Sequence, residues 1–185
     1  FYNVVYELFL LITPFVTTPY LARVLGPDGT GVYSFTASVV SYFTLLASLG
    51  IATYGQREIS FVQSDVESRS RVFWNTKIAQ MIAAAGSLVL FLCFIRISGG
   101  SVLYMVFSFN LLSVGFDVTW FFKGLEEFGI IVSRNVILKL LNILSIFLFV
   151  KSAKDLLLYA FIMCLFEFLS ALSLWVLLPG YIRKP

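Results

Sequence analysis

Long apolar stretches dominate this chain of 185 residues. Five of them run for about 18 residues or more with at most one charge, and a sixth comes close. The hydrocarbon core of a bilayer is about 30 Å thick, and an α-helix needs roughly 20 apolar residues to cross it. The composition agrees, because only 12% of the residues are charged, whereas a soluble domain carries about 25%. The sequence therefore predicts an all-α integral membrane protein with six transmembrane helices.

The ends of the apolar stretches set the limits of these helices. They are expected at residues 1–22, 32–55, 78–95, 102–122, 130–150 and 156–178. The first helix contains Pro14 and Pro19, which cannot donate backbone hydrogen bonds. Its outer half is therefore expected to be kinked or partly unwound.

The only long polar stretch covers residues 56–77 and is expected to form a cytoplasmic loop. Ser64 followed by Glu67 has the spacing of a capping box, which predicts that the third helix begins near Asp65 and enters the membrane after Lys77. With six spans, one set of alternate loops and adjoining helix ends holds nine Lys and Arg residues, and the other set holds four. Because these residues are enriched on the cytoplasmic side, the N-terminus is predicted to be cytoplasmic.

Five ionisable residues lie inside the predicted spans: Glu7, Asp117, Arg134, Lys139 and Glu167. Such a group costs about 2.5 to 3.5 kcal/mol at mid-membrane, so it normally faces a bundle interior, a partner or a water-filled cavity. Helical spacing also gives two polar stripes, which are Asn110, Ser113, Asp117 and Gly124 on the fourth span and Arg134, Asn135, Lys139, Asn142 and Ser145 on the fifth. We expect both stripes to face one polar space.

Depth along the spans, at about 1.5 Å per residue, indicates which charges could meet. Asp117 and Arg134 lie at similar depths, and so do Lys139 and Glu167. Two compatible interpretations follow. The charges hold the bundle together as ion pairs, or they line a pathway for a substrate or a coupling ion.

The sequence lacks the residues that several classes of function require. The chain has no histidine, no glycine-rich phosphate loop and no cluster with metal-ligand spacing. Cys93 and Cys164 lie in apolar segments and are interpreted as packing residues. A membrane-embedded transferase would rely on acidic loop residues, and only Glu126 and Glu127 qualify. The Lys and Arg residues mostly end apolar runs and do not form the basic face that binds nucleic acid. We therefore predict no enzyme, no cofactor and no nucleic-acid partner.

Two segments of the chain resemble a known family. TPYLARVLGP at 18–27, continuing to GVYS at 31–34, is similar to the first hairpin of bacterial polysaccharide repeat-unit flippases. DVTWFFKGLE at 117–126 is similar to the signature at the inner end of their fourth span. GQRE at 55–58 and the pair Arg134-Asn135 follow in the expected order. These flippases form the polysaccharide transporter family of the multidrug, oligosaccharidyl-lipid and polysaccharide exporter superfamily.

The resemblance implies a fold of two six-helix lobes around a central cavity. Residues 1–185 would be the N-terminal transmembrane lobe of a longer chain, so this sequence is expected to be a fragment. The implied function is a flippase in the bacterial inner membrane, which moves an undecaprenyl-diphosphate-linked oligosaccharide outward for O-antigen, capsule or related polymers. Expected partners are that lipid-linked oligosaccharide, membrane lipids, the C-terminal lobe of the same chain and the polysaccharide polymerase machinery.

The resemblance also assigns expected roles to the charges inside the spans. Cations bind phosphate groups well, so Arg134 and Lys139 are the first candidates for contacts with the diphosphate or the cavity. Further candidates for the cavity wall are Asn135, Asn142, Asp117, Asn110 and Arg57. Coupling to protons or sodium would fall to Glu7, Asp117 or Glu167, because the chain has no histidine.

Two other functions stay open at this point. A drug or small-cation antiporter of the same superfamily would share the fold but have a more acidic interior, and the two basic residues of the fifth span argue against it. A non-transporting membrane scaffold of polymer assembly would use the embedded charges only to hold its helices together. A second lobe with inward Arg or Lys would favour the flippase over the scaffold.

Overall fold

A computed structural model describes the backbone of residues 2–183 and the side chains of residues 13–183. Over this range the chain is helical and contains no strand, so the predicted all-α fold is confirmed. The α-helices are α1 (Tyr2–Val24), α2 (Gly26–Ser48), α3 (Ile51–Phe61), α4 (Val66–Ile97), α5 (Val102–Phe116), α6 (Thr119–Gly124), α7 (Phe128–Phe149) and α8 (Leu156–Ser173). Short 3-10 helices occur at η1 (Ala153–Asp155), η2 (Leu174–Val176) and η3 (Leu178–Gly180).

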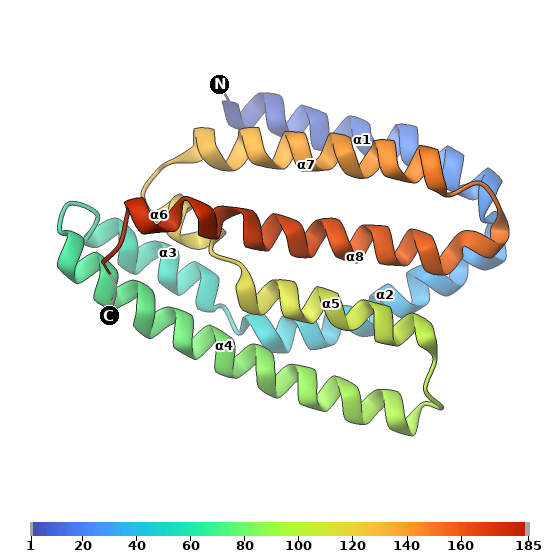
Figure 1. Cartoon of the computed structure of the whole chain (residues 1–185), viewed down its shortest axis with the longest axis horizontal. Coiled ribbons are helices and arrows are strands. Elements are labelled where there is room, and N and C mark those ends of the chain that lie inside the picture. Colours follow the sequence, from blue (N-terminus) through green and yellow to red (C-terminus); the bar gives the residue numbers. More distant parts are fainter. Residues whose placement is uncertain (1, 184–185) are drawn as a thin grey trace.

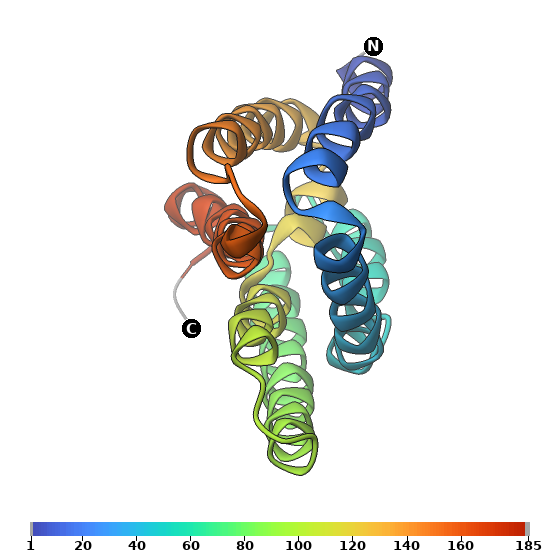
Figure 2. The same ribbon diagram turned by 90° about the vertical axis from the view of Figure 1, so that its right-hand side faces the viewer.

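The long helices run back and forth between the two ends of the molecule (Figure 1). α1 lies beside α7, α7 contacts α8, and α8 packs along α5. Beyond α5 lie α4 and α2, and the end-on view of Figure 2 shows α7, α8, α5 and α4 following one another. Five of the described helical stretches are long and apolar enough to cross a membrane. The chain is therefore a multi-pass membrane protein.

Two of the predicted spans are interrupted by irregular backbone. The span expected at 32–55 begins earlier, at Gly26, and is divided into α2 and α3 by Leu49 and Gly50, which both have positive φ, 41° and 70°. The span expected at 102–122 is divided into α5 and α6, because Asp117 adopts an extended conformation with ψ of 131°. Such backbone is tolerated at membrane depth only where other groups satisfy its hydrogen bonds.

The first and last spans also differ from expectation. α1 continues as one helix through Pro14 and Pro19, so the predicted partial unwinding is wrong. Each proline removes only one backbone hydrogen bond, and membrane helices tolerate such a loss. The last span ends its α-helix at Ser173 and continues as η2 and η3.

The polar stretch 56–77 is mostly helical, with a turn at residues 62–65. The prediction that the third helix begins near Asp65 is confirmed, but the proposed capping box of Ser64 and Glu67 is wrong. Asp65 is itself the N-cap, and its carboxylate accepts hydrogen bonds from the backbone amides of Glu67 and Ser68, at 3.1 and 3.2 Å. An aspartate at the N-cap accepts hydrogen bonds from the free backbone amides of the first helical turn as well as a serine does.

Replacing Asp65 with alanine should speed amide exchange at residues 66–69 and leave the rest of α4 unchanged. Hydrogen bonds from the Ser68 side chain and from the amides of Glu67 and Ser68 lower the pKa of the Asp65 carboxyl below 3.8. Because the folded pKa is depressed, this contribution is present above pH 3.8 and is lost as the pH falls through the lowered value. Exchange measured at several pH values checks this, and Asp65→Asn should lose the acid dependence. Identical exchange in Asp65→Ala and the parent would contradict the capping role.

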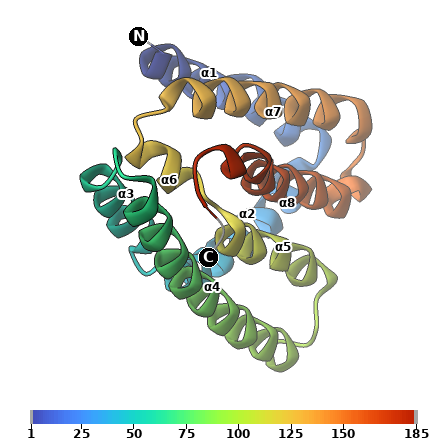
Figure 3. The same ribbon diagram turned by 60° about the vertical axis from the view of Figure 1, so that its left-hand side comes forward.

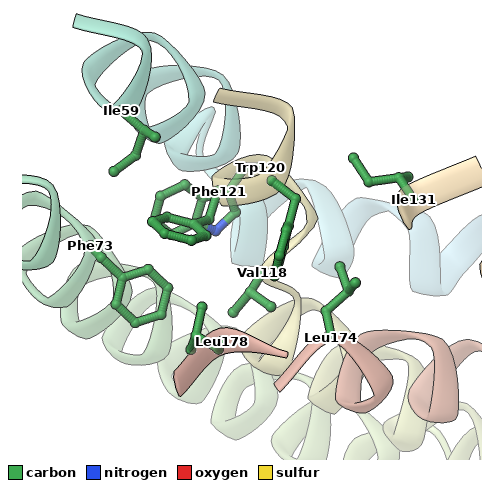
Figure 4. Packing of buried hydrophobic residues seen from close by; sticks show 9 residues of the cluster. Ile59, Phe73, Val118, Trp120, Phe121, Ile131, Leu174 and Leu178 are labelled. Atoms are coloured by element: carbon green, nitrogen blue, oxygen red, sulfur yellow. The ribbon is translucent and has the colours of Figure 1, made fainter. Parts of the chain in front are cut away.

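The most aromatic part of the core lies at the end of the molecule where α3, α6 and the C-terminal segment meet (Figure 3). Phe73 of α4 stacks on Trp120 of α6, with ring centroids 5.6 Å apart, and meets Phe121 edge-on. The same cluster includes Ile59 of α3, Leu174 of η2 and Leu178 of η3, together with Val118, Phe122 and Ile131 (Figure 4). The short helix α6 is therefore held on several sides by buried side chains.

Candidate functional site

A cavity of about 540 Å³ lies between α3, α6, α7 and α8. Six of the residues that the sequence singled out line it together: Asp117, Arg134, Asn135, Lys139, Asn142 and Glu167. Ser170 and Gln56 add further polar groups to the wall. The structure therefore brings the charges of the fourth, fifth and sixth predicted spans to one space inside the helix bundle.

The two cations of α7 have different surroundings. The Arg134 guanidinium donates hydrogen bonds to the Ser170 carbonyl, to the Ser173 hydroxyl at 3.4 Å and to the Asn135 side-chain oxygen at 2.6 Å. It therefore ties α7 to α8. Lys139 lies one to two turns further along α7, half-buried in the cavity wall, and forms no hydrogen bond or salt bridge with any described residue. The Glu167 carboxyl, at a similar depth in the same cavity wall, interacts with it only electrostatically, so the ammonium can still donate to an anionic ligand.

The two carboxylates are held by neutral donors. Asp117 Oδ1 accepts hydrogen bonds from the Thr119 amide at 3.0 Å and the Thr119 hydroxyl at 2.5 Å. Glu167 of α8 accepts one from the Asn110 side-chain amide of α5. Neither carboxylate forms a salt bridge with Arg134 or Lys139, so the predicted Asp117–Arg134 pair is wrong. The helix break places the Asp117 carboxylate at the start of α6, where it accepts hydrogen bonds from Thr119, while Arg134 donates to the backbone of α8.

Two other candidates do not line the cavity, and a third lies outside the described side chains. The Arg57 side chain of α3 is 68% exposed, contacts Glu58 at 3.4 Å and does not line this cavity, so its place in the cavity of the complete protein stays a prediction. Asn110 reaches the site only through its hydrogen bond to Glu167. The side chain of Glu7 lies outside the described residues.

A second cavity, of about 320 Å³, adjoins the first and shares Ala52, Asp117, Glu167 and Ser170 with it. Ser48, at the α2–α3 break, and Val114, next to the α5–α6 break, also line this space. Both irregular segments thus border the same polar interior. This placement agrees with the rule that irregular membrane backbone is buried or faces an aqueous cavity.

Sequence reasoning missed a buried polar network behind this wall. Lys77 of α4, expected to mark the entry to the membrane, is only 1% exposed and donates hydrogen bonds to the carbonyls of Gly115 and Asp117, at 2.7 and 3.0 Å. Gln80, one turn along α4, binds Val114 and Trp120. The sequence offered one signal for this network, because Lys77 and Gln80 are three residues apart and share a helix face. A basic residue beside a polar stretch, however, also fits the point where a helix enters the membrane.

The cavity wall can bind a polar, partly anionic ligand. Arg134 and Lys139 can contact phosphate oxygens through charge-assisted hydrogen bonds. Asn135, Asn142 and Ser170 offer amide and hydroxyl groups of the kind that bind sugar hydroxyls. These features define a multi-pass membrane protein with a charged cavity inside its helix bundle.

Residues 1–184 match the family described as "Polysaccharide biosynthesis protein", and the chain belongs to that family. It is 21% identical over 155 residues to the "Putative O-antigen transporter" of Escherichia coli (strain K12), which covers 82% of this chain and 37% of the relative. It is 25% identical over 145 residues to the protein of the same name from Shigella dysenteriae, covering 77% and 36%. The chain thus spans little more than a third of these curated relatives. No solved structure matches it.

Proposed function

We propose that the complete protein is a flippase, which moves an undecaprenyl-diphosphate-linked oligosaccharide from the cytoplasmic to the outer leaflet of the bacterial inner membrane. The family and the names of the two relatives support a role in polysaccharide export. The observation that carries the proposal is the cavity lined by both Arg134 and Lys139. The lipid tail would stay in the bilayer while the diphosphate and sugars cross inside, and no covalent bond would form or break.

The same cavity supports this function over its rivals. A small-cation antiporter would repel its own substrate, because three cations line the wall, Lys123, Arg134 and Lys139, against the two carboxylates of Asp117 and Glu167. A scaffold would use embedded charges to bind its own helices, but Lys139 forms no hydrogen bond or salt bridge with the described residues. Glu167 and Asp117 are the described carboxylates placed to couple transport to protons or sodium, because both border the two adjoining cavities.

The arrangement of the helix ends supports a cytoplasmic N-terminus. The start of α1, the turn between α3 and α4 and the segment that follows α8 lie toward the same end of the molecule (Figure 1). That end carries Arg57, Arg69 and Arg71, and basic residues are enriched on the cytoplasmic side. A second lobe of the same chain would close the cavity, and the polymerase machinery would receive the exported unit.

Deleting the gene in its own host tests the proposal. We expect polymer production to stop and the diphosphate-linked oligosaccharide to accumulate in the cytoplasmic leaflet, with both effects reversed by the intact gene. Leaflet location is measured in spheroplasts with a lectin or glycosidase that cannot cross the membrane. If the deletion strain still exposes the lipid-linked unit at the outer leaflet but lacks polymer, the scaffold function replaces the flippase.

A further inference from the structure

The break between α5 and α6 leaves four consecutive carbonyl groups without their helical partners. In an unbroken helix, the carbonyls of residues 114–117 would accept hydrogen bonds from the amides of residues 118–121. Here the Thr119 amide binds Asp117 Oδ1, and the Phe121 amide binds the Val118 carbonyl at 3.1 Å. In a membrane interior, carbonyls left unsatisfied would strongly destabilise this backbone.

Side chains from two other elements take over all four carbonyls. Gln80 Nε2 binds Val114 at 2.7 Å, Lys77 Nζ binds Gly115 and Asp117 at 2.7 and 3.0 Å, and Trp175 Nε1 binds Phe116 at 2.7 Å. Lys77 also reaches Gln80 Oε1 at 3.3 Å, and its ammonium lies 5.2 Å from the centre of the Trp175 ring. A lysine ammonium has three donors, and three acceptors surround this one.

This network determines where α6 lies. Gln80 Oε1 accepts a hydrogen bond from Trp120 Nε1 at 3.1 Å, which links α4 directly to α6. Trp120 packs against Gly55 of α3, and α6 contacts α3 and α7. As a result Asp117, Thr119 and Trp120 line the main cavity.

We propose that Lys77 is a positioning residue, which holds the α5–α6 segment broken and thereby fixes Asp117 and Trp120 in the cavity wall. A fully buried cation among neutral acceptors is costly to keep, and this role accounts for its presence. Lys77 acts on the cavity through the backbone of residues 115 and 117 without lining it. Its expected effect on transport rests on the proposed function, whereas its effect on the break does not.

Replacing Lys77 with methionine keeps most of the length of the unbranched side chain and removes its donors. In the complete protein, reconstituted in lipid nanodiscs, we expect amide exchange at residues 114–124 to rise about tenfold or more, because two carbonyls lose charged donors. Exchange in α2 and α7 should stay unchanged. Transport, followed as polymer production at matched protein abundance, should fall about tenfold. Lys77→Arg should restore both properties in part, because a guanidinium also donates to several carbonyls.

Two further variants complete the test. Arg71→Met removes a cation from the same helix, but that side chain is exposed and its salt bridge among the described residues is to the exposed Glu67, so exchange and transport should match the parent. Trp175→Phe removes the indole donor to the Phe116 carbonyl and should raise amide exchange at residues 114–124 a few-fold. This variant tests whether the donor side chains hold the break if Lys77→Met does not accumulate.

Unchanged exchange at residues 114–124 in Lys77→Met, or in Trp175→Phe where the first variant does not accumulate, would overturn the proposal. Altered exchange at that segment with normal transport would overturn it as well, because the position of the segment would then not matter to the cavity. The proposed function fails separately, if the unmodified protein does not expose the lipid-linked unit. The exchange measurement needs no substrate and remains valid in that case.

Discussion

Replacing Lys139 with alanine is expected to reduce polymer production about tenfold or more, while the protein accumulates normally. Lys139 lines the cavity and makes no hydrogen bond or salt bridge with the described side chains, so its removal should leave the fold intact. A hydrogen bond to a charged group contributes about 1.5 to 3 kcal/mol, and about 1.4 kcal/mol changes a rate tenfold. Polymer yield per cell, divided by protein abundance in the membrane, gives the measurement.

Matched variants separate the charge of Lys139 from its size and location. Lys139→Arg keeps the charge and should retain most of the activity. Lys151→Ala removes an exposed cation just beyond the end of the same helix and should have no effect. Wild-type polymer production in Lys139→Ala would remove this residue from the mechanism and weaken the assignment of the cavity to an anionic substrate.

Arg134 differs from Lys139 because it also has a structural contact. Its guanidinium binds the backbone of α8 at Ser170, so alanine here loosens the α7–α8 contact in addition to removing a charge. Reduced accumulation of an Arg134 variant would therefore not identify a ligand contact. For this reason the lysine gives the cleaner test of the proposed function.

The sequence was sufficient to predict that the embedded charges share one space. Exposure to lipid would cost free energy for each embedded charge, namely Asp117, Arg134, Lys139 and Glu167. Helical spacing also placed polar neighbours on the same helix faces as these charges. Both arguments need only the apolar length of the spans and the helical period. For that reason the predicted grouping agrees with the geometry of the main cavity.

The partners of these charges could not be predicted, because counting depth along a span assumes a continuous helix. The backbone leaves the helix at Asp117, so its carboxylate caps Thr119 and does not reach Arg134. The burial of Lys77 depends on carbonyls at residues 115 and 117, some 40 positions away in the chain. Neither break contains a proline, the usual sequence signal for one.

The structural roles of Gly55 and Gly124 could not be predicted from the sequence either. Both lie in segments that resemble the flippase family, but a sequence pattern does not say why glycine stands there. In the structure, a Cβ on Gly55 would lie 2.6 Å from the Trp120 ring, and one on Gly124 would lie 2.7 Å from the Gln56 carbonyl. These two glycines allow α3 and α6 to approach closely, as small residues do between membrane helices.

Replacing Gly124 with alanine is expected to destabilise the protein by about 1 to 2 kcal/mol, since overpacked sites typically cost about 1 to 3 kcal/mol and the better helix propensity of alanine offsets part of that cost. Two opposing effects decide whether the variant is more or less stable than the parent. Alanine is a better helix former than glycine by about 1 kcal/mol, which favours the variant. Its Cβ, however, would lie 2.7 Å from a backbone oxygen and 2.8 Å from Ile59 Cβ, and Ile59 is fully buried. Neither neighbour is the flexible end of a side chain, so α6 must move away from α3.

Thermal unfolding of the purified complete protein measures this effect, and two other glycines serve as controls. A Cβ added to Gly86 in α4 or to Gly129 in α7 would meet nothing within 4 Å, so alanine at either site should leave the unfolding temperature unchanged or slightly raised. Gly55→Ala should lower it as Gly124→Ala does, because the ring it meets is fixed by the hydrogen bond of Trp120 to Gln80. If Gly124→Ala unfolded at the same temperature as Gly86→Ala, the close approach of α3 and α6 would not be a determinant of this fold.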